Sequence, residues 1–89
     1  MKKAIEFDKN KSKWLKEKRG ISFEEIINLI KGKTNVLDDI KHPKKENQRI
    51  FVIKIKRYVY AVPYVEDDQK IFLKTAYPSR KATKKYLAK

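Results

Sequence analysis

The chain has 89 residues, and its 24 Lys and Arg residues against 11 Asp and Glu residues give a formal net charge of +13. This length suits one domain with a modest core, and the missing cysteine excludes disulfides, thiol chemistry and cysteine-bound metals. No stretch approaches the roughly 18 apolar residues of a membrane span, and the start lacks a signal-peptide core, so we expect a cytoplasmic protein. The charge favours a polyanionic partner, whether RNA, DNA, an acidic protein or an anionic membrane; a lysine-rich surface that serves only solubility or stability is the alternative.

The first predicted elements are a short strand and a basic helix. The segment AIEF (residues 4–7) fits a strand, and Asp8 is a candidate N-cap for a helix over 9–19. Gly20 ends that helix. Its only strongly apolar residues are Trp14 and Leu15.

The second helix has the clearest signal in the chain, GISFEEIINLIKG (residues 20–32). Ser22 as N-cap and Glu25 three residues later form a capping box, and Gly32 fits the C-terminal cap. Its apolar residues recur at helical spacing and predict a buried stripe of Phe23, Ile26, Ile27 and Ile30.

The second half of the chain is rich in β-forming residues. NVLDDI (residues 35–40) fits a short strand and KHPKKENQ (41–48) a basic loop; RIFVIKIK (49–56), YVYAVPYV (58–65) and KIFLKTAY (70–77) fit longer strands. A last short helix begins near Arg80. We therefore predict an α+β fold in which two N-terminal helices pack on an antiparallel three- to four-stranded meander, followed by a short C-terminal helix.

Strand alternation assigns the side chains to two faces if Lys56-Arg57 and Asp67-Asp68 are the turn centres. The face expected to pack on the helices holds Phe51, Ile53, Ile55, Tyr58, Tyr60, Val62, Tyr64, Ile71, Leu73, Thr75 and Tyr77. The other holds Ile50, Val52, Lys54, Val59, Ala61, Pro63, Val65, Phe72, Lys74 and Ala76. Lys54 and Lys74 then flank Ala61, as a shallow basic floor or as a plain solvent-exposed face. Pro63 implies a bulge or an edge position.

Few chemical motifs are available. There is no P-loop, GxGxxG, HExxH or zinc spacing, and the lone His42 lies in a basic loop. We therefore expect no metal and no cofactor. Residues 21–40 hold two basic and four acidic side chains, so we expect this segment to face away from a polyanion. The remaining groups, basic residues and tyrosines, suit RNA cleavage by the RNA's own 2′-OH, and they suit plain RNA binding equally well.

Four segments occur in order along nearly the whole chain: FDKNK (7–11), GISFEE (20–25), RIFVI (49–53) and RKAT (80–83). Together they resemble the BrnT-type toxins of bacterial type II toxin–antitoxin pairs. The resemblance implies a small RelE-like fold, ribonuclease activity, and neutralisation by a co-encoded antitoxin, expected to be a ribbon-helix-helix DNA-binding protein.

Within this resemblance, Arg80 and Lys81 match the family's Arg-Lys pair, and Tyr64 stands where members often carry His or Tyr. Lys74 falls near a basic position of the last strand. The chain departs from the family at Arg19, which replaces a His, and at Tyr86, which replaces a Glu. The family's His and Glu are therefore not available for proton transfer in this chain.

A cation at Arg80 is unfavourable for the dipole of a helix that starts there, which indicates a role other than helix stability. We predict catalytic roles for Arg80, Lys74 and Tyr64, and RNA contacts by Lys54, Lys81, Lys84 and Lys85. The leading hypothesis is a metal-independent endoribonuclease toxin. The alternatives are a non-catalytic RNA- or DNA-binding module and a basic protein that grips an acidic partner.

Overall fold

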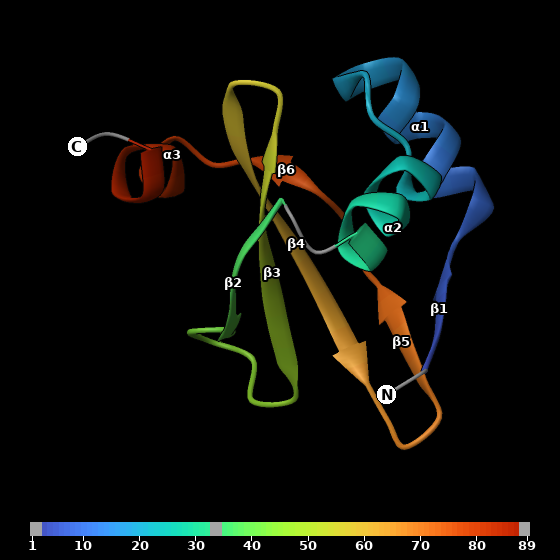
Figure 1. Cartoon of the computed structure of the whole chain (residues 1–89). Coiled ribbons are helices and arrows are strands. Elements are labelled where there is room, and N and C mark those ends of the chain that lie inside the picture. The colour runs from blue at the N-terminus through green and yellow to red at the C-terminus, as the bar shows by residue number, and fades with distance from the viewer. Residues whose placement is uncertain (1–2, 33–34, 88–89) are drawn as a thin grey trace.

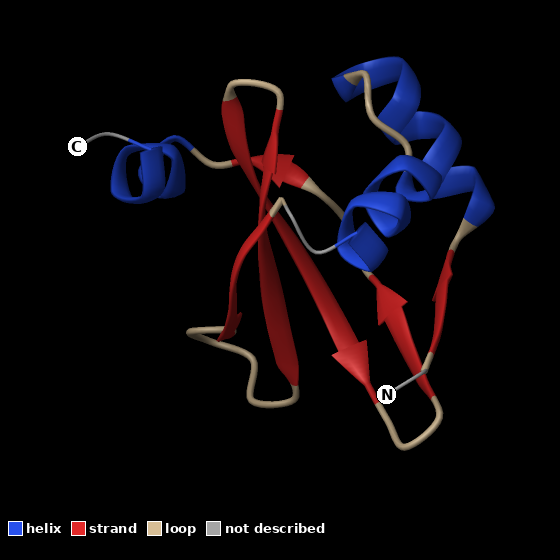
Figure 2. Ribbon diagram, in the orientation of Figure 1, coloured by secondary structure: helices blue, strands red, loops and turns tan. Residues whose placement is uncertain are grey.

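The computed structural model describes residues 3–32 and 35–87, and these form an α+β fold with three helices and a mixed six-stranded sheet (Figures 1 and 2). The elements follow in the order β1 (Ala4–Phe7), α1 (Lys9–Arg19), α2 (Phe23–Gly32), β2 (Val36–Lys41), β3 (Gln48–Ile55), β4 (Tyr58–Glu66), β5 (Lys70–Leu73), β6 (Tyr77–Pro78) and α3 (Arg80–Leu87). In the part of the chain that is described, every helix is too short or too polar to span a bilayer.

Helix α1 begins and ends where the sequence predicts. Asp8 caps it, since its Oδ1 accepts hydrogen bonds from the N–H groups of Asn10 and Lys11 at 2.8 and 3.3 Å. Gly20 ends it in the left-handed conformation, with φ 77°. A residue without a Cβ adopts this conformation at little cost, so the helix stops there.

The capping box of α2 is also confirmed, since the Glu25 N–H donates to Ser22 Oγ at 3.2 Å. A contact that the sequence did not reveal ties the two helices together. Ser12 of α1, 3% exposed, accepts from the Phe23 N–H at 2.9 Å and donates to Glu24 at 2.7 Å. Gly32 is the last residue of α2 and has no positive φ, so the predicted C-terminal cap is wrong at this position.

The sheet is larger than predicted. Its strand order is β1-β5-β4-β3-β2. Strand β6 also pairs with β4, on the same edge as β5 but nearer the start of β4. Strands β2 to β5 form the antiparallel meander. Strand β1 adds to it in parallel with β5, placing Ala4 opposite Lys70 and Phe7 opposite Leu73. The sheet is therefore mixed, because the segment at 4–7 joins the edge of the meander.

One face of the sheet packs on α1 and α2, as predicted, and we call it the core face. Its buried residues are Phe51, Ile53, Ile55, Val62, Tyr64 and Leu73, and the two helices with their link contribute Leu15, Ile21, Phe23 and Ile26 to the same cluster. The first turn centre, Lys56-Arg57, is right, since Ile55 pairs with Tyr58. The second lies one residue later than predicted, at Asp68-Gln69, since Glu66 pairs with Ile71; this moves the register by two residues and leaves the faces unchanged.

The assignment of faces fails after Leu73. Residues 74–76 leave the strand, and Ala76 becomes part of the core cluster while Tyr77 pairs with Ala61 and shares the opposite face. This break lies at Pro63, whose carbonyl accepts the Lys74 N–H at 2.8 Å. Because proline has no N–H to donate on that side, a continuous ladder cannot pass it, and the neighbouring strand divides into β5 and β6.

Candidate nucleic-acid interface

Helix α3 is anchored to the start of β4. Ser79 caps the helix by accepting the Ala82 N–H at 3.1 Å, a common role for serine. The Ser79 N–H donates to the Val59 carbonyl at 2.9 Å, and the Val59 N–H donates to Thr83 Oγ1 at 3.0 Å. Both backbone groups of Val59 thus bond to α3 and its cap, which determines where the helix starts.

The other end of α3 is held by Tyr86, whose hydroxyl donates to Asp38 of β2 at 2.7 Å. This bond lowers the pKa of Asp38 and raises the pKa of Tyr86. Since β3 lies between β4 and β2, α3 crosses the face of the sheet opposite α1 and α2 (Figure 1). We call this the outer face. Asp38 belongs to the acidic segment that was expected to face away from a polyanion, and it lies on the same face of the sheet as α3.

Because α3 crosses the outer face, the predicted basic floor is not open there. Val59 is 0% exposed and Val52 is 3% exposed, and Ala61 is also buried. Lys54 remains exposed and pairs with Val59 on the neighbouring strand. Val59 in turn bonds to Ser79 at the start of α3, so the Lys54 backbone lies about 10 Å, or two strand spacings, from the start of the helix.

The outward side of α3 carries four cations, which we call the α3 cation face: Arg80, Lys81, Lys84 and Lys85. All four are exposed, whereas Ala82, Thr83, Tyr86 and Leu87 are half-buried toward the sheet. Their spacing puts them on one side of the helix. Within residues 3–32 and 35–87, no carboxylate lies within ion-pair distance of any of them. The structure therefore brings these four predicted residues together without a salt bridge to any described carboxylate. Lys85 is near enough to Asp38 for its charge to add to the Tyr86 bond in lowering the pKa of that carboxyl.

A second group lies beside the α3 cation face along the edge of β4. Tyr77 stands opposite Ala61 on the outer face and is 38% exposed. On one side of Tyr77, the backbone N–H of Lys74 donates to the Pro63 carbonyl. On the other side, Arg80 directly follows Ser79, whose N–H donates to the Val59 carbonyl. The anchoring points Pro63, Ala61 and Val59 are each two residues apart, or about 7 Å. We call Lys74, Tyr77 and Arg80 the edge row.

Lys74 shares the outer face with Phe72, since its Nζ lies 5.8 Å from the centre of the Phe72 ring. The edge row thus combines two cations with exposed aromatic surface, which are the groups that hold a phosphate backbone and stack on unpaired bases. Tyr77 was not among the predicted site residues, because simple alternation places it on the core face. The signal that could have found it is Pro63, which interrupts that alternation.

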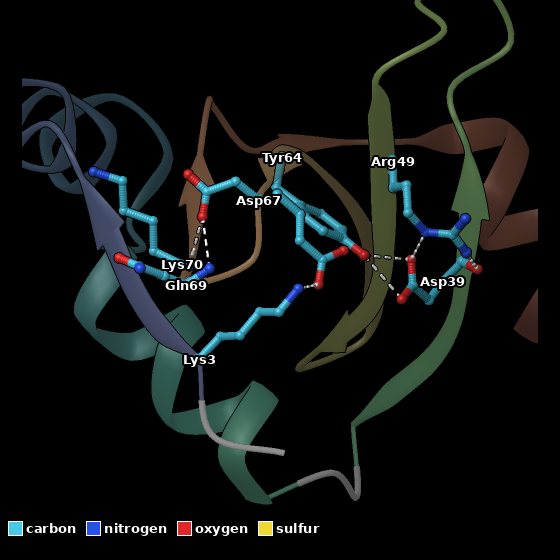
Figure 3. Close-up of polar contacts among 8 residues, drawn as sticks. Lys3, Asp39, Arg49, Tyr64, Asp67, Gln69 and Lys70 are labelled. Carbon is cyan, nitrogen blue, oxygen red and sulfur yellow. Dashed lines mark hydrogen bonds and ion pairs between the residues drawn. The ribbon is translucent and has the colours of Figure 1, made fainter.

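Tyr64, by contrast, lies on the core face and is 2% exposed. Its hydroxyl donates to both carboxylate oxygens of Asp39 at 2.7 and 2.9 Å, and Arg49 Nε contacts the same carboxylate at 3.1 Å (Figure 3). Its ring stacks on Phe51 with 4.2 Å between centroids. Burial, and then the bond to Asp39, raises the pKa of the Tyr64 phenol well above its ordinary value of 10.0. The structure does not bring Tyr64 together with Arg80 and Lys74, because they lie on opposite faces of the sheet.

His42, the lone histidine, lies in the basic loop between β2 and β3. His42 uses Nδ1 to accept the N–H groups of Lys44 and Lys45 at 3.0 and 3.2 Å, which orders the basic loop around an open hollow. Among the described residues, no group of three His, Asp or Glu side chains could hold a metal ion.

Comparison with protein-family models, with curated proteins and with solved structures finds no significant match to the chain. The resemblance to BrnT-type toxins therefore stays a prediction from sequence motifs. The features of this structure that point to a function are the α3 cation face and the edge row.

Proposed function

We propose that the chain binds single-stranded RNA on its outer face and cleaves it, as a ribonuclease toxin of a toxin–antitoxin pair, with the RelE-like fold that the motifs imply. The observation that carries the proposal is the edge row, in which exposed Tyr77 lies between Lys74 and Arg80 next to three further exposed cations. This arrangement offers charge to several successive phosphates and an aromatic ring to a base between them.

In the proposed reaction, the 2′-OH of the RNA attacks the adjacent phosphorus. The bond to the 5′ oxygen breaks, leaving a 2′,3′-cyclic phosphate and a 5′-OH. The phosphate gains negative charge on the way, so a cation aimed at it lowers the barrier. Arg80 is the best placed residue for this role, and Lys74 would hold a neighbouring phosphate. Tyr77, rather than the buried Tyr64, is the tyrosine that could relay a proton or stack on a base.

A non-catalytic RNA-binding module is the second candidate. Two observations favour it. In the edge row, Tyr77 is the only side chain besides the two cations that could transfer a proton. The two proton-transfer positions of the BrnT-type pattern carry other residues in this chain, Arg19 and Tyr86. The two candidates share a binding surface and differ in whether RNA is cut.

The deciding experiment incubates the purified chain with end-labelled single-stranded RNA and analyses the new ends. We expect 2′,3′-cyclic phosphates. Arg80→Ala should cleave about 10²- to 10³-fold more slowly, the usual loss when one transition-state donor is removed. Lys84→Ala is the matched control, since it removes one charge from the same helix but outside the edge row, and it should change the rate much less.

Both variants must show the parental circular dichroism spectrum. Binding without any cleavage would support the RNA-binding module. Cleavage by Arg80→Ala at the parental rate would overturn the site. A neighbouring reading frame for a small ribbon-helix-helix protein, and protection of the RNA when that protein is added, would support the toxin assignment.

A further inference from the structure

The only tryptophan of the chain is exposed and lies beside two cations. Trp14 lies on α1 and is 39% exposed. Lys11 Nζ lies 4.5 Å from the centre of its ring and the Arg19 guanidinium carbon lies 5.4 Å from it. The core contact of α1 is made by its neighbour Leu15, which is 0% exposed. Trp14 is therefore not needed to fill the core.

The charge around this indole is largely free. In the described part of the chain, no carboxylate lies within ion-pair distance of Lys11 or Arg19, whereas Lys16 is paired with Glu25 at 2.5 Å. The one acidic residue of α1 is Glu17. Cations beside an exposed aromatic ring have the same chemistry as the edge row, on a different element.

We infer that Trp14, Lys11 and Arg19 form a second contact site for single-stranded nucleic acid. The indole would stack on an unpaired base while the two cations bind flanking phosphates. The choice of RNA as ligand rests on the proposed function. The ligand is single-stranded, because a base inside a duplex has no free face to offer the ring.

An anionic membrane is the competing partner for a basic helix with a tryptophan. Membrane-surface helices bury a broad apolar face in the interface. Trp14 is the only strongly apolar residue on the exposed side of α1, since Leu15 points into the core. A single indole is a poor membrane anchor and a sufficient stacking platform, so the structure favours nucleic acid.

The position of α1 gives this site a distinct task. It packs on the core face, whereas α3 lies across the outer face (Figure 1). An RNA held at Trp14 is not at the edge row unless it passes around the sheet. The site would therefore raise affinity for long strands, which reach both surfaces, more than for short ones.

The test uses the fact that Trp14 is the sole tryptophan. Titration with a single-stranded oligoadenylate should quench its fluorescence to saturation, whereas a duplex of the same length should quench it little. A blue shift on adding vesicles that contain anionic lipid, without quenching by the oligonucleotide, would overturn the inference in favour of a membrane.

Affinity is then measured by anisotropy of a dye-labelled oligoadenylate. Trp14→Ala should weaken binding about 5- to 150-fold, the range seen when a stacking side chain is truncated, and Trp14→Phe should restore most of it. The Lys11→Ala/Arg19→Ala pair should weaken binding more than the Lys13→Ala/Lys18→Ala pair, which removes the same charge from the same helix. Parental affinity of Trp14→Ala, or equal losses in the two double variants, would overturn the inference.

The two proposals fail separately. If Arg80→Ala abolishes cleavage and Trp14→Ala binds as the parent does, the proposed function stands and the second site is wrong. If Trp14→Ala weakens binding and no variant or parent cleaves RNA, the second site stands and the catalytic proposal is wrong.

Discussion

Tyr64 and Tyr77 lie on either side of the Pro63 break, and the sheet gives them opposite environments. Tyr64 is 2% exposed on the core face, where Asp39 accepts its hydroxyl and Phe51 stacks on its ring. Tyr77 is 38% exposed on the outer face, in a row with Lys74 and Arg80. The comparison teaches that a motif position alone does not identify a working residue. The strand parity on either side of Pro63 decides which phenol can meet a ligand.

The largest effect that would test this contrast is on RNA. Tyr77→Ala should weaken RNA binding about 5- to 150-fold through lost stacking, whereas Tyr64→Phe should leave cleavage and binding per folded molecule unchanged. Tyr77→Phe keeps the ring and removes the proton, so it separates stacking from proton relay. Single-turnover rates and anisotropy titrations measure the two quantities. A loss in Tyr64→Phe with Tyr77→Ala unaffected would reverse the assignment.

The next effect is on stability and has the opposite pattern. Tyr64→Phe removes the donor to Asp39 from a buried site, so we expect the free energy of unfolding to fall by about 1–2 kcal/mol. Tyr77→Phe should change it by no more than about 0.5 kcal/mol, as is usual for exposed positions. Urea denaturation followed by circular dichroism measures both variants. Equal stabilities would mean that the Tyr64–Asp39 bond contributes nothing net.

Salt dependence should separate free charge from paired charge. Affinity for single-stranded RNA should fall between about 50 and 200 mM salt, because bound phosphates release counterions. Removing two cations of the α3 cation face with Lys84→Ala/Lys85→Ala should reduce the slope of log affinity against log salt by about 1.4. Arg49→Gln, which removes a cation already paired with Asp39, should leave the slope unchanged. A flat dependence in the parent would indicate a protein partner instead.

The smallest effect concerns the attachment of α3. The Tyr86 bond lowers the pKa of Asp38 below 3.8, so its contribution is lost as the pH falls through that lowered pKa. The same bond raises the pKa of Tyr86 above 10.0, so it is also lost as the pH rises through the raised value. The protection factors of the α3 amides against hydrogen exchange should be largest between these limits. Tyr86→Phe should lose this pH dependence. If the variant and the parent gave the same pH profile, the Tyr86–Asp38 bond would contribute nothing to the attachment of α3.

The local sequence rules succeeded where the side chain decides its own backbone geometry. Asp8, Gly20 and the Ser22–Glu25 pair define helix ends through contacts within a few residues, so they could be predicted without knowing the fold. The core face up to Leu73 was predicted for a similar reason, because hydrophobic alternation determines which residues share a face even though the second turn lies one residue later than predicted.

Apart from the cap predicted at Gly32, the failures involve distant partners. The parallel contact of β1 with β5, the crossing of α3 over the sheet and the Tyr86–Asp38 bond depend on segments dozens of residues apart. Four of the predicted site residues, Arg80, Lys81, Lys84 and Lys85, lie together because one helix carries them. Tyr64 lies apart from them on the core face, where strand alternation had already placed it; the parity change at the Pro63 break moves Tyr77 and not Tyr64.

The pairing of β1 with β5 also constrains how the molecule can be made. Ala4 meets Lys70, so the first strand has no partner until most of the chain has left the ribosome. Closing so long a loop costs entropy before any contact repays it, which slows folding of the sheet edge. The two N-terminal helices bury their stripe against strands that are synthesised after them. We therefore expect nascent chains that end before Leu73 to stay protease-sensitive along their whole length, with folding beginning only when the meander is complete.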